Sequence, residues 1–273
     1  MAWEYFISDD RLLASLGHID VLATFDDEGS MKVVATTLQV ENLSLAAALL
    51  AKAGNRLREL DLSQKQLKDI EALKVLTTLH SLDLSQTHIE DIEVLKGLTE
   101  LETLRLSGTL IKDIEALKEL TKLETLHLSG TLIEDIEALK KLTNLVDLDL
   151  TGTRIKDIKV LRGLKNLQTL KLSYTPIKDI EPLKELAALR TLYLPGTRIK
   201  DVEALKELTK LETLILTDTA IEDIEALKGL KALQTLGVTG ASADAIDRFD
   251  KQRVEMKLPP VSVRTGPLFS IDR

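Results

Sequence analysis

A leucine returns every 22 residues along most of this chain, and this repeat limits the fold more than any other feature. The leucines that open successive segments, without one insertion between them, are Leu57, Leu79, Leu101, Leu123, Leu145, Leu167, Leu189, Leu211 and Leu233. A fixed period of this length indicates supersecondary units that stack on one another. We therefore expect a stacked array of similar units over most of the chain.

The segment that opens at Leu101 shows two hydrophobic periods. Leu104 and Leu106 alternate with polar neighbours, which is the pattern of a strand with one buried face. After this strand, apolar residues recur at every third position: Ile111, Ile114, Leu117 and Leu120. That spacing is typical of a short 3-10 or helical segment with one buried side. One unit cannot bury both sides alone, so neighbouring units must stack, with parallel strands on one side and helical turns on the other. Because the helical side is wider than the ~4.8 Å strand spacing, we expect the stack to curve with the sheet inside.

The pattern Leu-x-x-Leu-x-Leu-x-x-Thr-x-Ile-x-Asp-Ile resembles the leucine-rich-repeat family over residues 57–240. Its 22-residue period is similar to that of bacterial internalins and of a eukaryotic phosphatase regulator. The resemblance implies a curved, right-handed α/β solenoid, with a parallel β-sheet on the concave face and short 3-10 or α segments on the convex face. It also implies a binding module that grips protein partners on the concave face.

The chain departs from the family pattern at the ninth position of the repeat, where the family usually has asparagine. Threonine occupies that position here: Thr87, Thr109, Thr131, Thr153, Thr175, Thr197 and Thr219. Asparagine would offer two donors and an acceptor to neighbouring turns, whereas threonine offers one hydroxyl on a β-branched stem. We expect a ladder of threonine hydroxyls bonded to the loop backbone.

An open stack exposes leucine at both ends unless each end is capped. We therefore expect an N-terminal capping region over residues 1–56, a repeat array over 57–240, and a C-terminal capping helix and tail over 241–273. Large aromatic side chains suit such caps. Most aromatic residues do lie in the end regions: Trp3, Tyr5, Phe6, Phe25, Phe249 and Phe269.

Local patterns predict the elements of both end regions. A short helix is expected over residues 10–16, a hairpin over 21–25 and 31–35, and a helix over 44–53. Ala35, Leu38 and Val40 keep the strand phase one period before Leu57, which suggests a degenerate tenth repeat. Near the C-terminus we expect a helix over 242–249 with Ser242 as its N-cap, and an end of regular structure at residues 259–260, which are both proline.

Composition argues against several classes of function. The net charge is −8, and no local basic stripe is evident, so binding to a nucleic-acid backbone is not expected. The chain has no cysteine, which excludes disulfides, cysteine zinc sites and thiol nucleophiles. The first ten residues do not resemble a signal peptide, and no apolar run approaches the roughly 20 residues of a membrane span. The simplest expectation is a cytoplasmic monomer that does not bind membranes.

The sequence shows no catalytic motif, and we expect no enzyme activity, no cofactor and no metal. The four histidines form no metal-binding pattern, and there is no phosphate-binding glycine loop. One carboxylate row invites a calcium hypothesis: Asp69, Asp91, Asp113, Asp135, Asp157, Asp179, Asp201 and Asp223. Each of these residues precedes a helical turn, so we expect it to cap that turn rather than to bind an ion. A basic row stands three residues after a glutamate in most repeats and is interpreted as a solvated face: Lys74, Lys96, Lys118, Lys140, Arg162, Lys184, Lys206 and Lys228.

The candidate site lies where the central outward row of the sheet changes character. That row is Asp61, Asp83, Arg105, His127, Asp149, Lys171, Tyr193, Ile215 and Gly237, and it turns from ionic to amphipathic at its end. Tyrosine is a favoured interface anchor. We therefore predict a partner-binding patch of Lys171, Tyr174, Thr191, Tyr193 and Ile215.

The function predicted from these features is a non-catalytic protein–protein recognition scaffold. One alternative is a regulatory subunit or inhibitor of an enzyme, which the phosphatase-regulator resemblance suggests. A second is a near-consensus or engineered scaffold with no native partner, because the repeats are unusually regular. An outward row of threonines also suggests ice binding, but charged residues interrupt that surface: the row beside it carries Arg105, Asp149 and Lys171.

Overall fold

The computed structural model describes the backbone of residues 4–8, 11–16, 19–25 and 31–37, and the backbone and side chains of residues 57–265. The chain forms two compact units, Met1–Ile133 and Glu134–Arg273. The helix predicted over residues 44–53 lies outside the described residues. Within the described part of the chain, no helix is long and apolar enough to cross a membrane.

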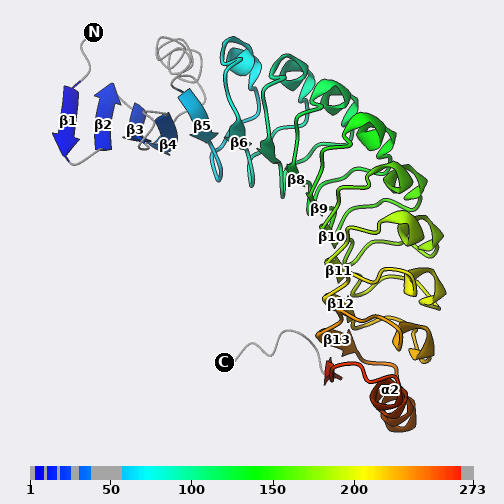
Figure 1. Ribbon diagram of the computed structural model, residues 1–273. Coiled ribbons are helices and arrows are strands. Elements are labelled where there is room, and N and C mark those ends of the chain that lie inside the picture. Colours follow the sequence, from blue (N-terminus) through cyan, green and yellow to red (C-terminus); the bar gives the residue numbers. More distant parts are fainter. Residues whose placement is uncertain (1–3, 9–10, 17–18, 26–30, 38–56, 266–273) are drawn as a thin grey trace. The chain divides into compact units, whose positions relative to one another are not determined.

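In the first unit, each repeat supplies one short strand and one 3-10 turn (Figure 1). Its elements are β1 (Glu4–Ser8), β2 (Arg11–Leu16), β3 (Ile19–Phe25), β4 (Met31–Thr37), β5 (Leu57–Asp61), η3 (Glu71–Val75), β6 (Ser81–Asp83), η4 (Glu93–Gly97), β7 (Thr103–Arg105), η5 (Glu115–Glu119) and β8 (Thr125–His127). From β4 to β8, each strand pairs parallel with the next. Leu60 lies beside Leu82, and Leu82 beside Leu104, so the 22-residue period sets the register of the array strands.

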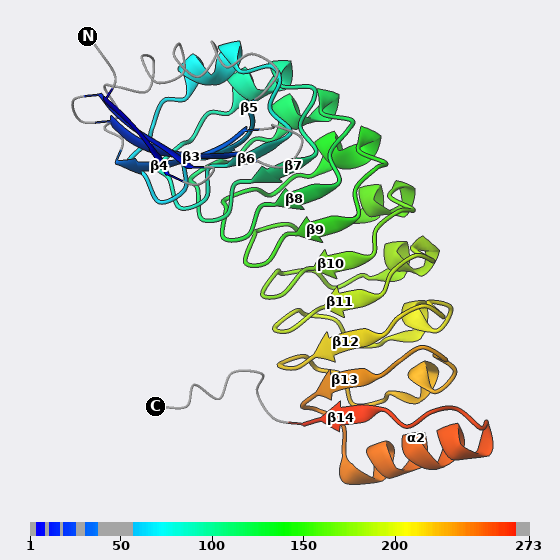
Figure 2. The same ribbon diagram turned by 60° about the vertical axis from the view of Figure 1, so that its left-hand side comes forward.

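The second unit continues the same alternation and ends in an α-helix and a further strand. Its elements are η6 (Glu137–Lys141), β9 (Asp147–Asp149), η7 (Lys159–Gly163), β10 (Thr169–Lys171), η8 (Glu181–Glu185), β11 (Thr191–Tyr193), η9 (Glu203–Leu205), β12 (Thr213–Leu216), η10 (Glu225–Leu227), β13 (Thr235–Val238), α2 (Ala243–Glu255) and β14 (Ser262–Arg264). All its strands pair parallel with their neighbours. In each unit the strands lie along one side of the stack and the 3-10 turns along the other (Figure 2). The predicted α/β solenoid is confirmed.

The core of the array is aliphatic, as the leucine pattern predicted. Leu148, for example, points inward from the middle of β9 and is 0% exposed. The hydroxyl of Thr109 donates to the carbonyl of Leu106 at 2.7 Å. The same bond recurs at Thr87, Thr131, Thr153, Thr175, Thr197 and Thr219. The predicted hydroxyl ladder is therefore confirmed, and each bond closes the turn that follows its strand.

The N-terminal strands differ from the prediction in two ways. Residues 11–16 form β2 rather than a helix, because pairing with β1 on one side and β3 on the other overrides their helical propensity. The predicted hairpin strands pair antiparallel as β3 and β4. However, β4 itself pairs parallel with β5 and places Val33 beside Leu60. This is an offset of 27 residues, so the register expected from a tenth repeat, with Leu38 beside Leu60, is wrong.

At the C-terminus, α2 begins as predicted, because the side chain of Ser242 accepts a hydrogen bond from the N–H of Ala245 at 3.2 Å. Phe249 of this helix is buried. Regular structure does not end at the two prolines, however. Residues 262–264 form β14, which pairs parallel with β13 and places Val263 beside Leu236. The prolines lie in the connection, where no ladder N–H is needed, so they do not prevent the strand.

Arg253 fixes α2 to the last 3-10 turn. Its side chain is 1% exposed and has no carboxylate partner among the described residues. Its guanidinium donates instead to the carbonyls of Lys228 at 3.1 Å, Leu230 at 2.9 Å and Pro259 at 2.9 Å. It also lies 5.6 Å from the centre of the Phe249 ring. One buried cation thus satisfies three main-chain acceptors at the end of the array.

Candidate functional site

Four outward positions of the second unit lie side by side in one row of the sheet. Lys171 of β10 pairs with Tyr193 of β11, Tyr193 with Ile215 of β12, and Ile215 with Gly237 of β13. Outward residues of neighbouring parallel strands stand about 5 Å apart, so this row forms one continuous surface. The structure therefore brings together three of the five predicted site residues in this row.

The polar members of the predicted patch lie beside the tyrosine. Lys171 is half-buried and forms an ion pair with Asp149 of the preceding strand at 3.6 Å. Thr191 is half-buried and lies in the adjacent outward row, between Thr169 and Thr213. Both residues fit the predicted surface, although Lys171 already has a carboxylate partner.

Ile215 is not an exposed contact residue, and its predicted place in the patch is wrong. It is 2% exposed. Its outward neighbour on β13 is Gly237, and a Cβ built there would stand 3.1 Å from Cδ1 of Ile215. The isoleucine therefore spreads over the bare backbone of Gly237, with half-buried Tyr193 on its other side. Ile215 lies beside Tyr193 on the next strand, and the accessible part of the row consists of Lys171 and Tyr193.

Tyr174, which the sequence placed in the predicted patch, lies in the turn after β10 and not on a strand. Its side chain is 56% exposed. Its backbone has a φ of 56°, in the left-handed region. The same turn position is glycine in several other repeats, with φ near 70° at Gly108, Gly130 and Gly152. A side chain in this conformation costs roughly 1–2 kcal/mol, which glycine avoids. Gln64, Gln86 and Asp218 adopt the same conformation at this turn position, so the exposed aromatic ring, and not the left-handed backbone, distinguishes Tyr174.

A row of basic side chains borders the turn that carries Tyr174. Read along the sequence, no basic stripe is apparent, because these residues stand in separate repeats. Aligned by the 22-residue period, they occupy the first and third positions after the ladder threonine. We call this row the basic edge: Arg154, Lys156, Lys178, Arg198 and Lys200. All five are exposed.

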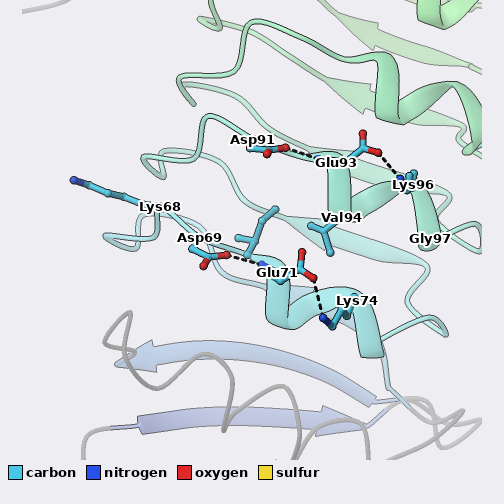
Figure 3. A pocket seen from close by; sticks show the side chains of 10 residues that line it. Lys68, Asp69, Glu71, Lys74, Asp91, Glu93, Val94, Lys96 and Gly97 are labelled. Atoms are coloured by element: carbon cyan, nitrogen blue, oxygen red, sulfur yellow. Dashed lines mark hydrogen bonds and ion pairs between the residues drawn. The ribbon is translucent and has the colours of Figure 1, made fainter.

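On the side of the stack that carries the 3-10 turns, aspartate side chains accept hydrogen bonds from the backbone. The N–H of Glu71 donates to Oδ1 of Asp69 at 2.8 Å, and Lys74 pairs with Glu71 at 2.8 Å (Figure 3). The same carboxylate cap recurs at Asp91, Asp113, Asp135, Asp157, Asp179, Asp201 and Asp223. The predicted capping role of the aspartate row is confirmed. In keeping with it, the backbone N–H of Lys159, and then its ammonium, hold the pKa of Asp157 below its usual value.

A surface groove lies between the 3-10 turns η3 and η4, and most of its charged groups are already engaged. Its lining includes Asp69, Asp91, Lys74 and Lys96, and Figure 3 shows these side chains in the caps and ion pairs of their own turns. Among the described residues, no group of three or more histidine, aspartate or glutamate side chains converges as metal ligands would. The groove therefore offers no site comparable to the tyrosine surface.

Comparison with known sequences decides the family. Sequence models described as "Leucine Rich repeats (2 copies)" match residues 55–97, 77–119, 99–141, 121–163, 143–185, 165–207 and 187–229. The chain belongs to the leucine-rich-repeat family. No curated protein sequence matches this leucine-rich-repeat chain.

Among solved structures, the chain is similar to an internalin. Internalin C2 of Listeria monocytogenes is 31% identical, with a TM-score of 0.64; the match covers 74% of this chain and 85% of that one. A leucine-rich-repeat protein of Leptospira interrogans is 24% identical, with a TM-score of 0.70, over 77% of this chain and 55% of that one. The ectodomain of a plant receptor kinase of Arabidopsis thaliana, in complex with CASPARIAN STRIP INTEGRITY FACTOR 2, is 21% identical with a TM-score of 0.64, and the match covers 80% of this chain and 28% of that one. The last two matches show a shared fold.

Proposed function

We propose that this leucine-rich-repeat protein is a non-catalytic recognition scaffold that binds a protein partner through the outward strand face of its second unit. The observation that supports this most directly is the pair of tyrosines: Tyr193 on the face itself and Tyr174 in the turn at its border. Both bring a large apolar ring with a polar tip, which is what interface anchors provide. The proposed contact surface is Tyr174, Tyr193, Thr191 and Lys171.

The fold supports binding rather than catalysis. The repeats present a regular, shallow surface of short strands, and the leucines that make up the core are fully used in packing. Among the described residues, the carboxylates of the aspartate row serve as caps and do not converge. Tyr193 lies beside buried Ile215 on the next strand, and a rigid neighbour of this kind lowers the entropy that the tyrosine loses on binding.

Capture with matched variants tests the proposal. The full chain is immobilised, proteins from the source lysate are captured, and the affinity of the main captured protein is measured for wild type, Tyr193→Ala and Arg105→Ala. Arg105 occupies the same position of its repeat in the first unit and is also half-buried. We expect Tyr193→Ala to weaken binding by about 2 kcal/mol or more, roughly 30-fold, and Arg105→Ala to change it little.

The melting temperature of each variant separates binding from folding. Tyr193→Ala uncovers part of Ile215, so a stability loss of about 1 kcal/mol is expected, which leaves the chain folded. Normal binding by Tyr193→Ala, together with loss of binding by Arg105→Ala, would move the site to the first unit and contradict the proposal.

A further inference from the structure

Among the side chains of residues 57–265, the basic edge has no partner. Arg154, Lys156, Lys178, Arg198 and Lys200 are all exposed, and within residues 57–265 none of the five side chains takes part in an ion pair or a hydrogen bond. On the other side of the stack, by contrast, lysines pair with glutamates in most repeats. The positive charge of the basic edge is therefore not compensated by an ion pair within the described residues 57–265.

Its members stand close to one another. The N–H of Arg198 donates to the carbonyl of Ile177 at 2.9 Å, so neighbouring repeats remain one strand spacing apart at this edge. Lys156, Lys178 and Lys200 occupy the same position in three successive repeats, and their backbones are thus about 5 Å apart. Like charges at this separation are destabilising. This arrangement of like charges does not stabilise the fold, but it would favour the binding of an anionic ligand.

The neighbouring carboxylates do not neutralise the edge fully. Asp157, Asp179 and Asp201 follow the three lysines in sequence, and each carboxylate is held by a hydrogen bond from the backbone of the next 3-10 turn. Three carboxylates beside the five cations of the basic edge leave a net positive charge. In three other repeats the two positions of the edge carry no net positive charge: Leu132 with Glu134, His88 with Glu90, and Ala220 with Glu222. Two further repeats carry a single lysine there, Lys68 and Lys112, so positive charge at these positions is densest between Arg154 and Lys200, in a chain whose net charge is −8.

The edge is centred on the exposed tyrosine. Arg154 and Arg198 lie in the repeats on either side of the one that carries Tyr174, and the position between them is Pro176, two residues after the tyrosine. Two residues of extended chain span about 7 Å. The ring of Tyr174 lies over Gly196, two residues before Arg198. An uncharged aromatic ring therefore stands among positions that carry two guanidinium groups, each of which can bind a carboxylate through two parallel hydrogen bonds.

We propose that the basic edge and Tyr174 together bind an acidic, extended segment of the protein partner. Carboxylates of that segment pair with the lysines and arginines, and an apolar side chain packs on the ring of Tyr174. This inference rests on the proposed function and specifies the chemistry of the partner. A protein segment fits better than a nucleic acid, because single carboxylates can be spaced to avoid Asp157, Asp179 and Asp201, whereas a continuous phosphate backbone would be repelled by them.

Selection from random peptides tests the proposal without a known partner. A displayed library of peptides of about 12 residues, long enough to cross several strand spacings, is selected on the full chain. We expect the enriched peptides to carry more aspartate and glutamate than the unselected library, together with an apolar residue. A labelled enriched peptide then serves as the probe for affinity measurements.

Charge reversal with a matched control locates the contact. The double variant Lys156→Glu, Lys200→Glu should lower the affinity for the peptide by about 10-fold or more, because two ion pairs become repulsive. Lys68→Glu with Lys112→Glu makes the same charge change at the same repeat position in the first unit, where both lysines are exposed. This control should change affinity by about twofold at most, through net charge alone.

Three outcomes would overturn the inference. The first is a set of selected peptides that carries no more aspartate and glutamate than the unselected library, or that binds the Lys156→Glu, Lys200→Glu double variant as well as it binds the wild type. The second is equal weakening by both double variants. The third is a poly(dT) oligonucleotide of about 20 nucleotides that binds more tightly than the peptides and loses its affinity on charge reversal at the basic edge. If partner capture depends on Tyr193 but not on Lys156 and Lys200, the proposed function stands and this inference alone fails.

Discussion

The ring of Tyr174 lies directly over Gly196, the residue at the same turn position of the next repeat. A Cβ built at Gly196 would stand 2.8 Å from Cε1 of Tyr174 and closer still to Cδ1. Both residues have a positive φ, 56° for Tyr174 and 64° for Gly196. Glycine at 196 thus meets two demands at once: it accepts the left-handed turn, and it leaves room for the aromatic ring.

Gly196→Ala should destabilise the protein by about 2–4 kcal/mol, from a strained φ of roughly 1–2 kcal/mol and from the overlap with the ring. The same change in a Tyr174→Gly background should lower the free energy of unfolding only by the cost of the strained φ, because the ring that overlaps the new Cβ is absent. Urea denaturation of the four chains gives both values. Equal losses in the two backgrounds would show that the ring does not rest on Gly196.

Leu148→Ala should cost about 2–5 kcal/mol, because it opens a cavity in the middle of an aliphatic core where the leucine is 0% exposed. Thr169→Ala is the control, since Thr169 is a half-buried outward residue on the adjacent strand, and it should cost about 1 kcal/mol or less. Chemical denaturation measures both. A loss below about half a kcal/mol for Leu148→Ala would contradict the packing of the core.

Arg253→Met should destabilise the C-terminal end of the array by about 2–4 kcal/mol, because it leaves the carbonyls of Lys228, Leu230 and Pro259 without their donor. Arg248→Met, on an exposed side of the same helix, should have little effect. Hydrogen exchange of the β13 and β14 amides shows where the loss occurs. Unchanged exchange in Arg253→Met would mean that water satisfies these carbonyls equally well.

The carboxylate cap at Asp157 makes part of the stability depend on pH in the acid range. The folded pKa of Asp157 lies below its usual value of about 4 because Lys159 stabilises the carboxylate. Its contribution is complete above the unfolded pKa and is lost as the pH falls through the folded pKa. We therefore expect the difference in unfolding free energy between wild type and Asp157→Asn to shrink as the pH falls from about 6 to about 2. A constant difference in urea titrations across that range would exclude an ionised cap.

The repeat made most of the fold predictable, because a 22-residue period determines both the strand register and which side of each segment is buried. The hydroxyl ladder and the aspartate caps followed from local chemistry within one repeat. The errors arose where contacts between segments decide the outcome. Residues 11–16 form a strand because two strands flank them, and β14 forms because β13 presents an open edge.

The candidate site was predictable only in part, for the same reason. Ile215 is outward, as its position requires, yet Gly237 beside it allows it to be buried. Tyr174 was predicted as a member of the patch, but its left-handed backbone became visible only in the structure. The basic edge could have been found by aligning the repeats and comparing one column at a time, because its residues are neighbours in space and not in sequence.

Tyr174→Gly should separate binding from stability. Removing the side chain relieves roughly 1–2 kcal/mol of backbone strain. It also removes the packing of the ring on Gly196, and glycine gives the unfolded chain more conformational freedom, so both of these effects destabilise the protein. The relieved strain and these two effects nearly cancel, so we expect the unfolding free energy to stay within about 1 kcal/mol of wild type. Binding of the partner, or of the selected acidic peptide, should fall by about 2 kcal/mol, roughly 30-fold.

Gln86→Gly is the matched control for this prediction. Gln86 occupies the same turn position in the first unit, has a φ of 59°, and covers Gly108 as Tyr174 covers Gly196. Its replacement removes the same strain and a similar stacked side chain, so its stability should change by a similar amount while binding stays at the wild-type level. If both variants weaken binding equally, the effect comes from the turn backbone. If neither does, the strain at Tyr174 serves no contact, and the anchor of the surface is Tyr193 alone.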